Sequence, residues 1–452
     1  MTEATELQGR WWLPDHLDHR VFGTLKWDCA GGGTLHLEDE LRPVVWKDNV
    51  LADGSVQKYR DDRGDTQRRY PLILGQTDNR AFTLLDASRL SVRELGTAGS
   101  VERVHVNRFL DGAWFDDPDE LRVDRVIVDL RHLTGWVNHS GLDVDYRFDE
   151  PEDDVFAVIS ATTLPAFNTD HNGGSVRLAQ RLHETGDRIH LLGVKQDWSL
   201  RLIQPEPEPL QGFMGTASDF QDLLTIAVGD AAAFERVVVQ HPDLPQRSLA
   251  GTPIANWRED IAYHARWSIH SKPGDPVKKH DLYFTFDDLG SIEGVGRWLA
   301  TADNYRTELG RVMATRYSDD MYLEDRIMNV SAALDSFDMH RRGTGKWVEY
   351  SKRVRRCVDL AGQPFLDLIA TDPTRWVRTV VDTRDDLAHH RERFRVDGSI
   401  GEHLLSEQLF WLFAICMLRV ADAPSAVFES IGRHAQFRWL TERAKEAEGA
   451  LP

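Results

Sequence analysis

Short alternating or apolar runs, separated by Gly, Asn and Asp turns, dominate the first 300 residues of the chain. Because successive side chains of a strand point to opposite faces of a sheet, such runs predict strands. Clear examples cover residues 19–27, 32–39, 70–76 and 81–87. Thr77, Asp78, Asn79 and Arg80 offer the turn chemistry of a tight hairpin between the last two runs.

A second hairpin is predicted further along, from 261–270 and 279–288 joined across the segment SKPGDPVK. The acidic stretch DEPEDD at 149–154 predicts a seam between two β-rich lobes, although a long loop would have the same composition. The front of the chain is therefore expected to be rich in β-structure.

From about Ser291 the hydrophobic period becomes helical. A connecting helix or helix pair is predicted over 291–314, and longer amphipathic helices over 319–339, 346–370, 373–390, 401–421 and 424–447. Helix start and stop signals separate them: RRGTG, the sequence Thr371-Asp372-Pro373, and DGSIG.

The predicted class is α+β, with a β-rich front followed by an all-α bundle. The expected domains are a β-rich lobe over 1–150, a second β-rich lobe with a connecting helix over 151–308, and a helical bundle over 309–452.

Composition fits this picture of a multidomain globular protein. At 452 residues, 41% hydrophobic and 28% charged, the chain is expected to form two or three domains. The N-terminus lacks the pattern of a signal peptide, and the longest apolar run, 409–418, is shorter than the roughly 20 residues that span a bilayer. Three widely spaced cysteines indicate neither a disulfide framework nor a zinc finger. We expect a cytoplasmic protein without a membrane segment.

The net charge of −19 is distributed unevenly. From Leu309 onward there are 21 basic and 22 acidic residues, against 33 and 51 before it, so the acidity belongs to the front. Phosphate contacts need Lys and Arg, and a nucleic-acid partner would therefore bind the back of the chain. The candidate contacts form three groups: Arg341 and Arg342; Lys352, Arg353, Arg355 and Arg356; and Arg391, Arg393 and Arg395.

One helix of the predicted bundle carries a constellation that can do chemistry. Asp385 and His389 are four residues apart, so on a helix they share a face and the carboxylate can orient the imidazole. Arg384 lies five residues, roughly 7.5 Å of helix rise, before His389. RNA cleavage without a metal needs a base for the 2′-OH, a donor for the leaving 5′-oxygen, and positive charge on the phosphorane.

The spacing between this arginine and histidine is weak by itself. The same spacing recurs at Arg236 and His241, on a β-branched run that ends at Pro242. A surface ion pair or a core histidine with its hydrogen bonds satisfied explains most isolated cases. His390 pairs by spacing with Asp386 and is the second candidate for the catalytic histidine. Adjacent histidines point to different helix faces, so no metal site and no cofactor are expected.

Many tryptophans lie in the front of the chain. They could form a sugar-binding platform, but buried core is the favoured interpretation for most of them. His139 and His171 lie in turn-like segments without partners at diagnostic spacing, and no catalytic role is assigned to them. The tryptophans concerned are Trp11, Trp12, Trp27, Trp46, Trp114, Trp136 and Trp198.

These motifs together resemble the HEPN superfamily, and more narrowly its ApeA-type antiphage defence proteins. RDDLAH at 384–389 is similar to the R-polar-x-x-x-H motif of HEPN ribonucleases, with Asp385 where Asn is more frequent. The stretch YLEDRIMNVSAALDSFDMH resembles the first helix of the HEPN bundle, with Asp335 where an acidic residue commonly faces the active site. At the front, GRWWLP, RVFGTLKW and ILGQTDNRAFTLLDA are similar to the N-terminal region of ApeA-type proteins.

The resemblance implies a dimeric, metal-independent endoribonuclease that cleaves RNA, with tRNA as the expected substrate, to stop translation in the infected cell. Arg384, Asp385 and His389 would form its site, and the N-terminal region would sense a phage-derived trigger or restrain the nuclease. Two alternatives remain open: an inactive bundle whose β-rich front recognises a phage protein or a glycan, and one half of a toxin–antitoxin pair.

Overall fold

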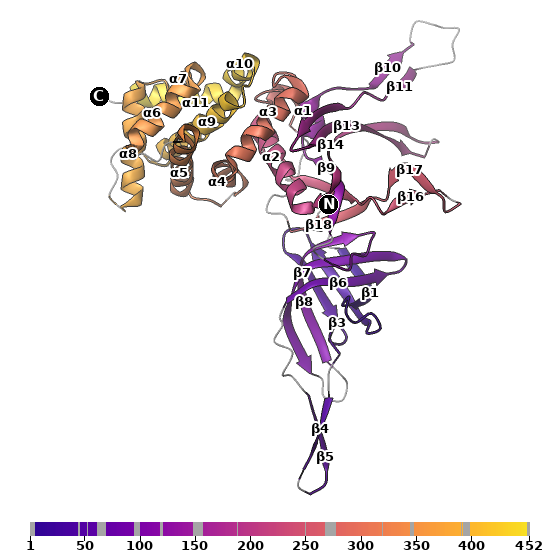
Figure 1. The fold of residues 1–452 in the computed structure, drawn as a ribbon. Helices are drawn as coiled ribbons and strands as arrows, with labels where there is room; N and C mark the ends of the chain where they lie inside the picture. Colours follow the sequence, from indigo (N-terminus) through magenta and orange to yellow (C-terminus); the bar gives the residue numbers. More distant parts are fainter. Residues whose placement is uncertain are drawn as a thin grey trace. The chain divides into compact units, whose positions relative to one another are not determined.

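The computed structural model describes most of the 452 residues. The described ranges are 5–43, 46–51, 53–60, 69–94, 100–117, 121–147, 157–187, 189–248, 250–266, 277–318, 320–343, 348–389, 391 and 398–449. The predicted α+β class is confirmed, because strands fill the front of the chain and helices its back (Figure 1).

The chain forms two compact units, whose limits differ from the expected domains. Unit 1 contains residues 1–128, 203–213 and 234–270, and unit 2 contains 129–202, 214–233 and 271–452. The expected boundary at 150 falls between two strands of unit 2 that pair with each other, β10 (Leu142–Tyr146) and β11 (Ala157–Ala161). The expected boundary at 308 falls inside α4 (Arg306–Tyr317). The seam residues 149–154 themselves lie outside the described part of the chain.

Unit 1 is built on an antiparallel barrel of six strands. Its order is β8-β3-β2-β1-β6-β7, and β7 pairs with β8 to close the ring. The bounds are β1 (Thr5–Trp12), β2 (Val21–Asp28), β3 (Gly32–Leu37), β6 (Arg69–Thr77), β7 (Arg80–Glu94) and β8 (Ser100–Asp111). Thr77 pairs with Arg80, so the predicted tight hairpin is confirmed. Closure leaves the barrel without a free sheet edge between these strands.

The barrel is filled by the inward side chains of its alternating strands. Buried and more exposed side chains alternate along β2. The buried residues of the barrel include Trp11 on β1, Trp27 on β2 and Phe82 on β7. Gly75 pairs with Trp11 across β1 and β6, and a Cβ at this position would collide with the indole ring. Glycine is therefore required there so that the tryptophan can lie flat inside the barrel.

A buried carboxylate lies among these apolar side chains. Glu102 accepts hydrogen bonds from the Tyr70 hydroxyl at 2.6 Å and from the backbone N–H of Leu41 at 2.9 Å. Its oxygen Oε1 also pairs with Nε of Arg89 at 2.7 Å. Every buried charge needs such partners, and this network keeps Glu102 satisfied inside the barrel.

Further strands complete unit 1 and connect it to unit 2. They are β4 (Trp46–Val50), β5 (Val56–Arg60), β9 (Arg122–Leu130), β15 (Phe234–Gln240), β16 (Pro245–Arg247), β17 (Pro253–Arg258) and β18 (Ile261–Ala265). β18 pairs with β8 and β15. The predicted hairpin from 261–270 to 279–288 is wrong: the second segment is not a strand but belongs to unit 2, where Tyr283, Phe284 and Phe286 are buried.

Unit 2 begins with strands and continues into helices. Besides β10 and β11 it contains β12 (Phe167–His171), β13 (Gly174–Gly186) and most of β14 (Leu192–Pro209). Its first helical elements are α1 (Leu133–Val137), most of α2 (Leu210–Val228), the short η3 (Lys279–Asp281), α3 (Ser291–Asn304) and α4. Asp222 of α2 accepts a hydrogen bond from Tyr317 of α4, which joins these two helices through a buried polar contact.

The C-terminal helices form the predicted bundle (Figure 1). They are α5 (Leu323–Arg342), α6 (Tyr350–Ala361), α7 (Gln363–Ile369), α8 (Pro373–Ala388), α9 (Gly398–Val420), α10 (Ser425–Arg433) and α11 (Ala435–Gly449). The helix predicted over 346–370 is two helices, because Gly362 has φ +69° and Pro364 follows it. The helix predicted over 424–447 is likewise interrupted, at His434.

α9 is the central helix of this bundle. It packs against α5, α6 and α7, and its residues Leu409 to Leu418 are all buried. The segment Ile400–Val420 is long and apolar enough to cross a membrane, but 78% of its apolar window is buried inside the protein. Its hydrophobicity is thus accounted for by its position in the core.

Candidate functional site

Helix α8 carries the candidate catalytic residues at its C-terminal end. Its start is fixed by Asp372, whose carboxylate accepts hydrogen bonds from the backbone N–H groups of Thr374 and Arg375 at 2.9 and 3.0 Å. Trp376 and Val380 are buried and anchor one face of the helix in the bundle. The run 384–389 therefore sits on a rigid, capped helix.

Within the described part of the chain, the guanidinium group of Arg384 makes two contacts. Its Cζ lies 4.4 Å from the centre of the Tyr350 ring, at the start of α6, and its Nη1 lies 3.6 Å from Oδ1 of Asp385. The side chain is 31% exposed. Arg384 is thus packed on one side and open to solvent on the other, as a phosphate-binding arginine must be.

His389 ends the helix. Its backbone N–H donates to the carbonyl of Asp385 at 3.1 Å, and its side chain is exposed. No carboxylate of the described residues forms an ion pair with its imidazole, and the Asp385 carboxylate lies next to Arg384 instead. The expected orienting contact from Asp385 to His389 is therefore not formed in this structure. His390, the second candidate, lies outside the described residues.

Asp335, the further candidate on α5, is paired with a basic residue of α6. Its Oδ1 lies 2.8 Å from Nη1 of Arg353. Asp335 and Arg384 also flank the same phenol: burial raises the pKa of Tyr350, Arg384 lowers it, and Asp335 raises it. The fold thus brings Asp335 into the neighbourhood of Arg384 by way of Tyr350, across more than 30 residues of sequence.

Four of the predicted RNA contacts are occupied within the protein. Arg353 is 8% exposed and holds Asp335, so it does not lie on a solvated helix face. Arg356 and Arg341 lie 3.2 and 3.6 Å from the carboxylate of Asp338, which is 1% exposed. Arg355 pairs with Asp359 at 2.9 Å on the surface. The carboxylates of Asp335 and Asp338 on α5 are thus neutralised by three of these residues, Arg341, Arg353 and Arg356, whose role is structural.

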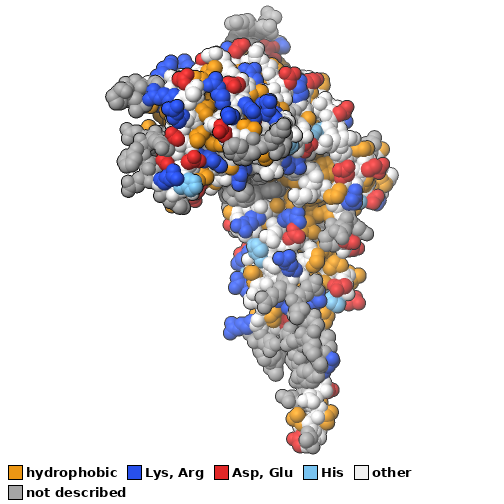
Figure 2. All heavy atoms as spheres, turned by 60° about the vertical axis from the view of Figure 1, so that its left-hand side comes forward, with side chains coloured by type: hydrophobic (Ala, Val, Ile, Leu, Met, Phe, Trp, Pro, Cys, Tyr) orange, Lys and Arg blue, Asp and Glu red, His pale blue; other side chains and the backbone are white. Residues whose placement is uncertain are grey.

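The remaining predicted RNA contacts differ in their surroundings. Lys352 pairs with Glu349 at 2.9 Å, while Arg342 and Arg391 are exposed. Figure 2 shows Lys and Arg side chains on the helical part of the chain interspersed with acidic ones. Arg393 and Arg395 lie outside the described residues. Arg342 and Arg391 are therefore the best placed of the described set to meet a phosphate.

The repeated arginine–histidine spacing at 236–241 belongs to a different setting. Arg236 lies on strand β15 and pairs with Asp260 at 3.1 Å, while His241 packs edge-on against Phe115. The interpretation of this pair as accidental agrees with its strand location, because the five-residue spacing does not bring the two side chains to one helical site.

The tryptophans of the front are mostly core residues, as predicted. Exposure is 0 to 6% for five of them and 47% for Trp114, while the side chain of Trp46 lies outside the described part of the chain. The five are Trp11, Trp12, Trp27, Trp136 and Trp198.

Two histidines left without a role do have acidic partners in the fold. His139 lies 3.0 Å from Asp287, and His171 lies 3.4 Å from Asp303. These partners are more than 130 residues away in sequence, so no local spacing could reveal them. The same holds for Tyr350, whose contact with Arg384 the sequence does not signal.

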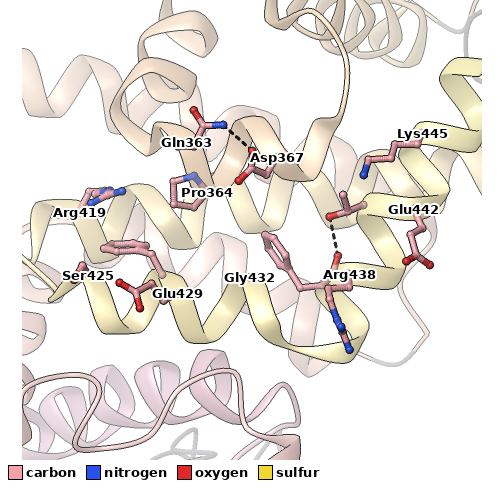
Figure 3. Close-up of a pocket in the computed structure, with 13 residues that line it drawn as sticks. Gln363, Pro364, Asp367, Arg419, Ser425, Glu429, Gly432, Arg438, Glu442 and Lys445 are labelled. Carbon is pink, nitrogen blue, oxygen red and sulfur yellow. Dashed lines mark hydrogen bonds between the residues drawn. The ribbon is translucent and has the colours of Figure 1, made fainter.

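A cavity of about 550 Å³ lies elsewhere in the bundle, among α7, α9, α10 and α11 (Figure 3). Phe428 and Phe437 contribute apolar surface, and its charged lining is balanced between basic and acidic side chains. None of Arg384, Asp385 and His389 lines it. The charged residues are Arg419, Arg438, Lys445, Asp367, Glu429 and Glu442.

Comparison with known proteins identifies the front of the chain. A profile of the family "ApeA N-terminal domain 1" matches residues 6–298, well over half of the sequence. The chain belongs to the ApeA family. It is thus an ApeA-type antiphage defence protein, in which the matched region contains the barrel and the strands of unit 2, and the helical bundle follows. No curated protein and no solved structure matches the chain.

Proposed function

We propose that this ApeA-type protein is a HEPN endoribonuclease that acts in antiphage defence by abortive infection. The observation that carries the proposal is the position of Arg384 and His389 at the exposed end of the capped helix α8, inside a helical bundle that follows an ApeA N-terminal region. tRNA is the proposed substrate, and the N-terminal region is proposed to sense a phage-derived trigger or to restrain the bundle.

The proposed reaction is an internal transesterification. The 2′-oxygen attacks the adjacent phosphorus, and the P–O5′ bond breaks. The 2′-hydroxyl proton passes to the imidazole of His389, and a second proton is given to the leaving 5′-oxygen. Arg384 would stabilise the charge on the phosphorane, since its N–H groups can bind two phosphate oxygens at once. The products are a 2′,3′-cyclic phosphate and a 5′-hydroxyl.

A homodimer would solve the problem of proton supply. One imidazole cannot serve as base and acid at the same moment, whereas two copies of α8 facing each other would place one histidine on each side of the phosphate. The exposure of His389 is compatible with such an arrangement. The proposed mechanism uses protein side chains alone and needs no metal or cofactor.

The test is cleavage of tRNA by purified protein, with and without co-expressed phage proteins as the trigger and with and without EDTA. Sequencing of the RNA ends should find 2′,3′-cyclic phosphates that disappear in His389→Ala and Arg384→Ala. His241→Ala is the matched control: it removes the histidine of the second arginine–histidine pair and should cleave as the wild type does. Undiminished cleavage by both α8 variants would refute the assignment.

The retained alternative is a binding module without catalysis. Two observations favour it: His389 lacks an acidic partner among the described residues, and β10 and β11 present the paired residues Val144 and Ile159 at 43% and 54% exposure. Contiguous exposed apolar surface is a feature of protein-binding sites. A wild type that leaves every tRNA intact in the presence of the trigger would favour this function.

A further inference from the structure

Tyr350 links the candidate nuclease helix to two other helices of the bundle. It is the first residue of α6, its ring receives the guanidinium of Arg384 from α8 at 4.4 Å, and Ser331 of α5 lies beside its hydroxyl. Ser331 is completely buried, and so is the hydroxyl oxygen of Tyr350. The ring is therefore held at its far end by the bundle core while its face is offered to Arg384.

The phenol remains a neutral ring under physiological conditions. Burial raises its pKa above the ordinary value, and this effect outweighs the lowering by the neighbouring Ser331 and by the charge of Arg384. A neutral aromatic face attracts a cation through its quadrupole, with an interaction that strengthens as water is excluded. Tyr350 thus offers Arg384 a fixed, uncharged platform.

Arg384 needs such a platform because its own side chain is long and flexible. Among the described residues its ion-pair partner is the neighbouring Asp385, which is 49% exposed and 3.6 Å away, and an exposed pair of this kind orders a side chain weakly. A guanidinium packed over a ring face keeps its in-plane N–H groups available for a phosphate. The ring can therefore fix the group without competing for its hydrogen bonds.

We propose that Tyr350 is a positioning residue, which holds the guanidinium of Arg384 in the orientation that binds the scissile phosphate of RNA. This inference rests on the proposed ribonuclease function and deepens it. Tyr350 acts through Arg384 and exchanges no proton with the substrate. The ring carries this role, and the hydroxyl takes no part in it.

The first test compares ring removal with hydroxyl removal. Tyr350→Leu should lower kcat/KM for tRNA cleavage by about tenfold to a hundredfold, because misplacing a catalytic group lowers reaction rates by factors of this size. Tyr350→Phe should stay within about threefold, because the quadrupole is retained. Phe428→Leu is the matched control. It removes a buried ring of α10 whose centre lies 3.8 Å from Cζ of Arg419 on α9, and it should leave kcat/KM within about twofold.

The second test asks whether Tyr350 works through Arg384. Affinity for tRNA is measured in the His389→Ala background, in which the RNA stays intact, for Tyr350→Leu, Arg384→Ala and both together. Tyr350→Leu should weaken binding about threefold to tenfold when Arg384 is present and have no further effect when Arg384 is absent. Additive losses would indicate general destabilisation and overturn the inference.

Fluorinated phenylalanines at position 350 provide a test that does not depend on whether the Tyr350→Leu variant folds. They keep the shape of phenylalanine but weaken the quadrupole, so kcat/KM should fall stepwise with fluorine number. Equal activity across the series, or equal losses in Tyr350→Phe and Tyr350→Leu, would overturn the platform role while the ribonuclease function stands. A wild type that cleaves no RNA would instead refute the proposed function, and the binding cycle would still decide the role of Tyr350.

Discussion

Replacing Asp338 by Asn should destabilise the bundle strongly. Asp338 is 1% exposed on α5, and its carboxylate lies between Arg341 of the same helix at 3.6 Å and Arg356 of α6 at 3.2 Å. Asparagine keeps the size of the side chain but removes the negative charge. Its amide N–H₂ group can only repel the donors of the two guanidinium groups.

The magnitude follows from the burial of the three groups. Removing one partner of a buried ion pair costs about 3 to 5 kcal/mol, because the remaining charge is left uncompensated. The side chains of Arg341 and Arg356 are 28% and 33% exposed, so both can recover part of their hydration. We therefore expect a smaller loss in the free energy of unfolding, about 2 to 3 kcal/mol. At roughly 2 to 4 °C per kcal/mol, the melting temperature should fall by about 4 to 12 °C.

The assay is thermal and urea unfolding of Asp338→Asn beside Asp359→Asn. Asp359 makes the same kind of contact, with Arg355 at 2.9 Å, but its side chain is 59% exposed, so its loss should cost less than about 1 kcal/mol. Affinity of Asp338→Asn for tRNA, measured below the unfolding transition, should not fall, because two cations are released. Equal melting temperatures for the two variants would refute the structural role of Arg341 and Arg356.

Three further outcomes are expected. Arg342→Ala and Arg391→Ala should each reduce the slope of log Kd for RNA against log salt concentration by about 0.7 and leave the melting temperature unchanged. An unchanged slope would show that the substituted residue does not contact RNA. Burial raises the pKa of Asp222 to about 8, although the hydrogen bond from Tyr317 lowers it, so the stability that the protonated carboxyl contributes is full below about pH 4 and is lost as the pH rises towards 8. In Asp222→Asn the melting temperature should depend less on pH between those values. A plot of melting temperature against pH that runs parallel to that of the wild type would contradict this. Gly75→Ala should destabilise the barrel by about 1 to 3 kcal/mol and change the near-ultraviolet circular dichroism of Trp11, because the new methyl group collides with the indole. An unaltered spectrum and stability would show that the ring can move aside.

Local pattern was enough to predict the α+β class, the 77–80 hairpin and the helical back of the chain. Alternation of period two and a helical period record which face of an element is buried, and that information is present in any short stretch. The same logic failed at the 346–370 and 424–447 helices, where Gly362 and His434 end one helix and begin another. It failed also at 279–288, where the aromatic run resembles a strand but forms turns within unit 2 that bury Tyr283, Phe284 and Phe286.

The sequence by itself determined the residue types at the end of α8, because Arg384, Asp385 and His389 lie within one helical turn and a half of each other. Only the tertiary structure decided what surrounds them. Tyr350 and Asp335 reach the site from other helices, and Asp385 turns to Arg384 rather than to His389. Arg353 and Arg356 are engaged by the α5 acids Asp335 and Asp338. Helical spacing fixes distances along one element, whereas burial and charge pairing depend on which elements the hydrophobic core brings together.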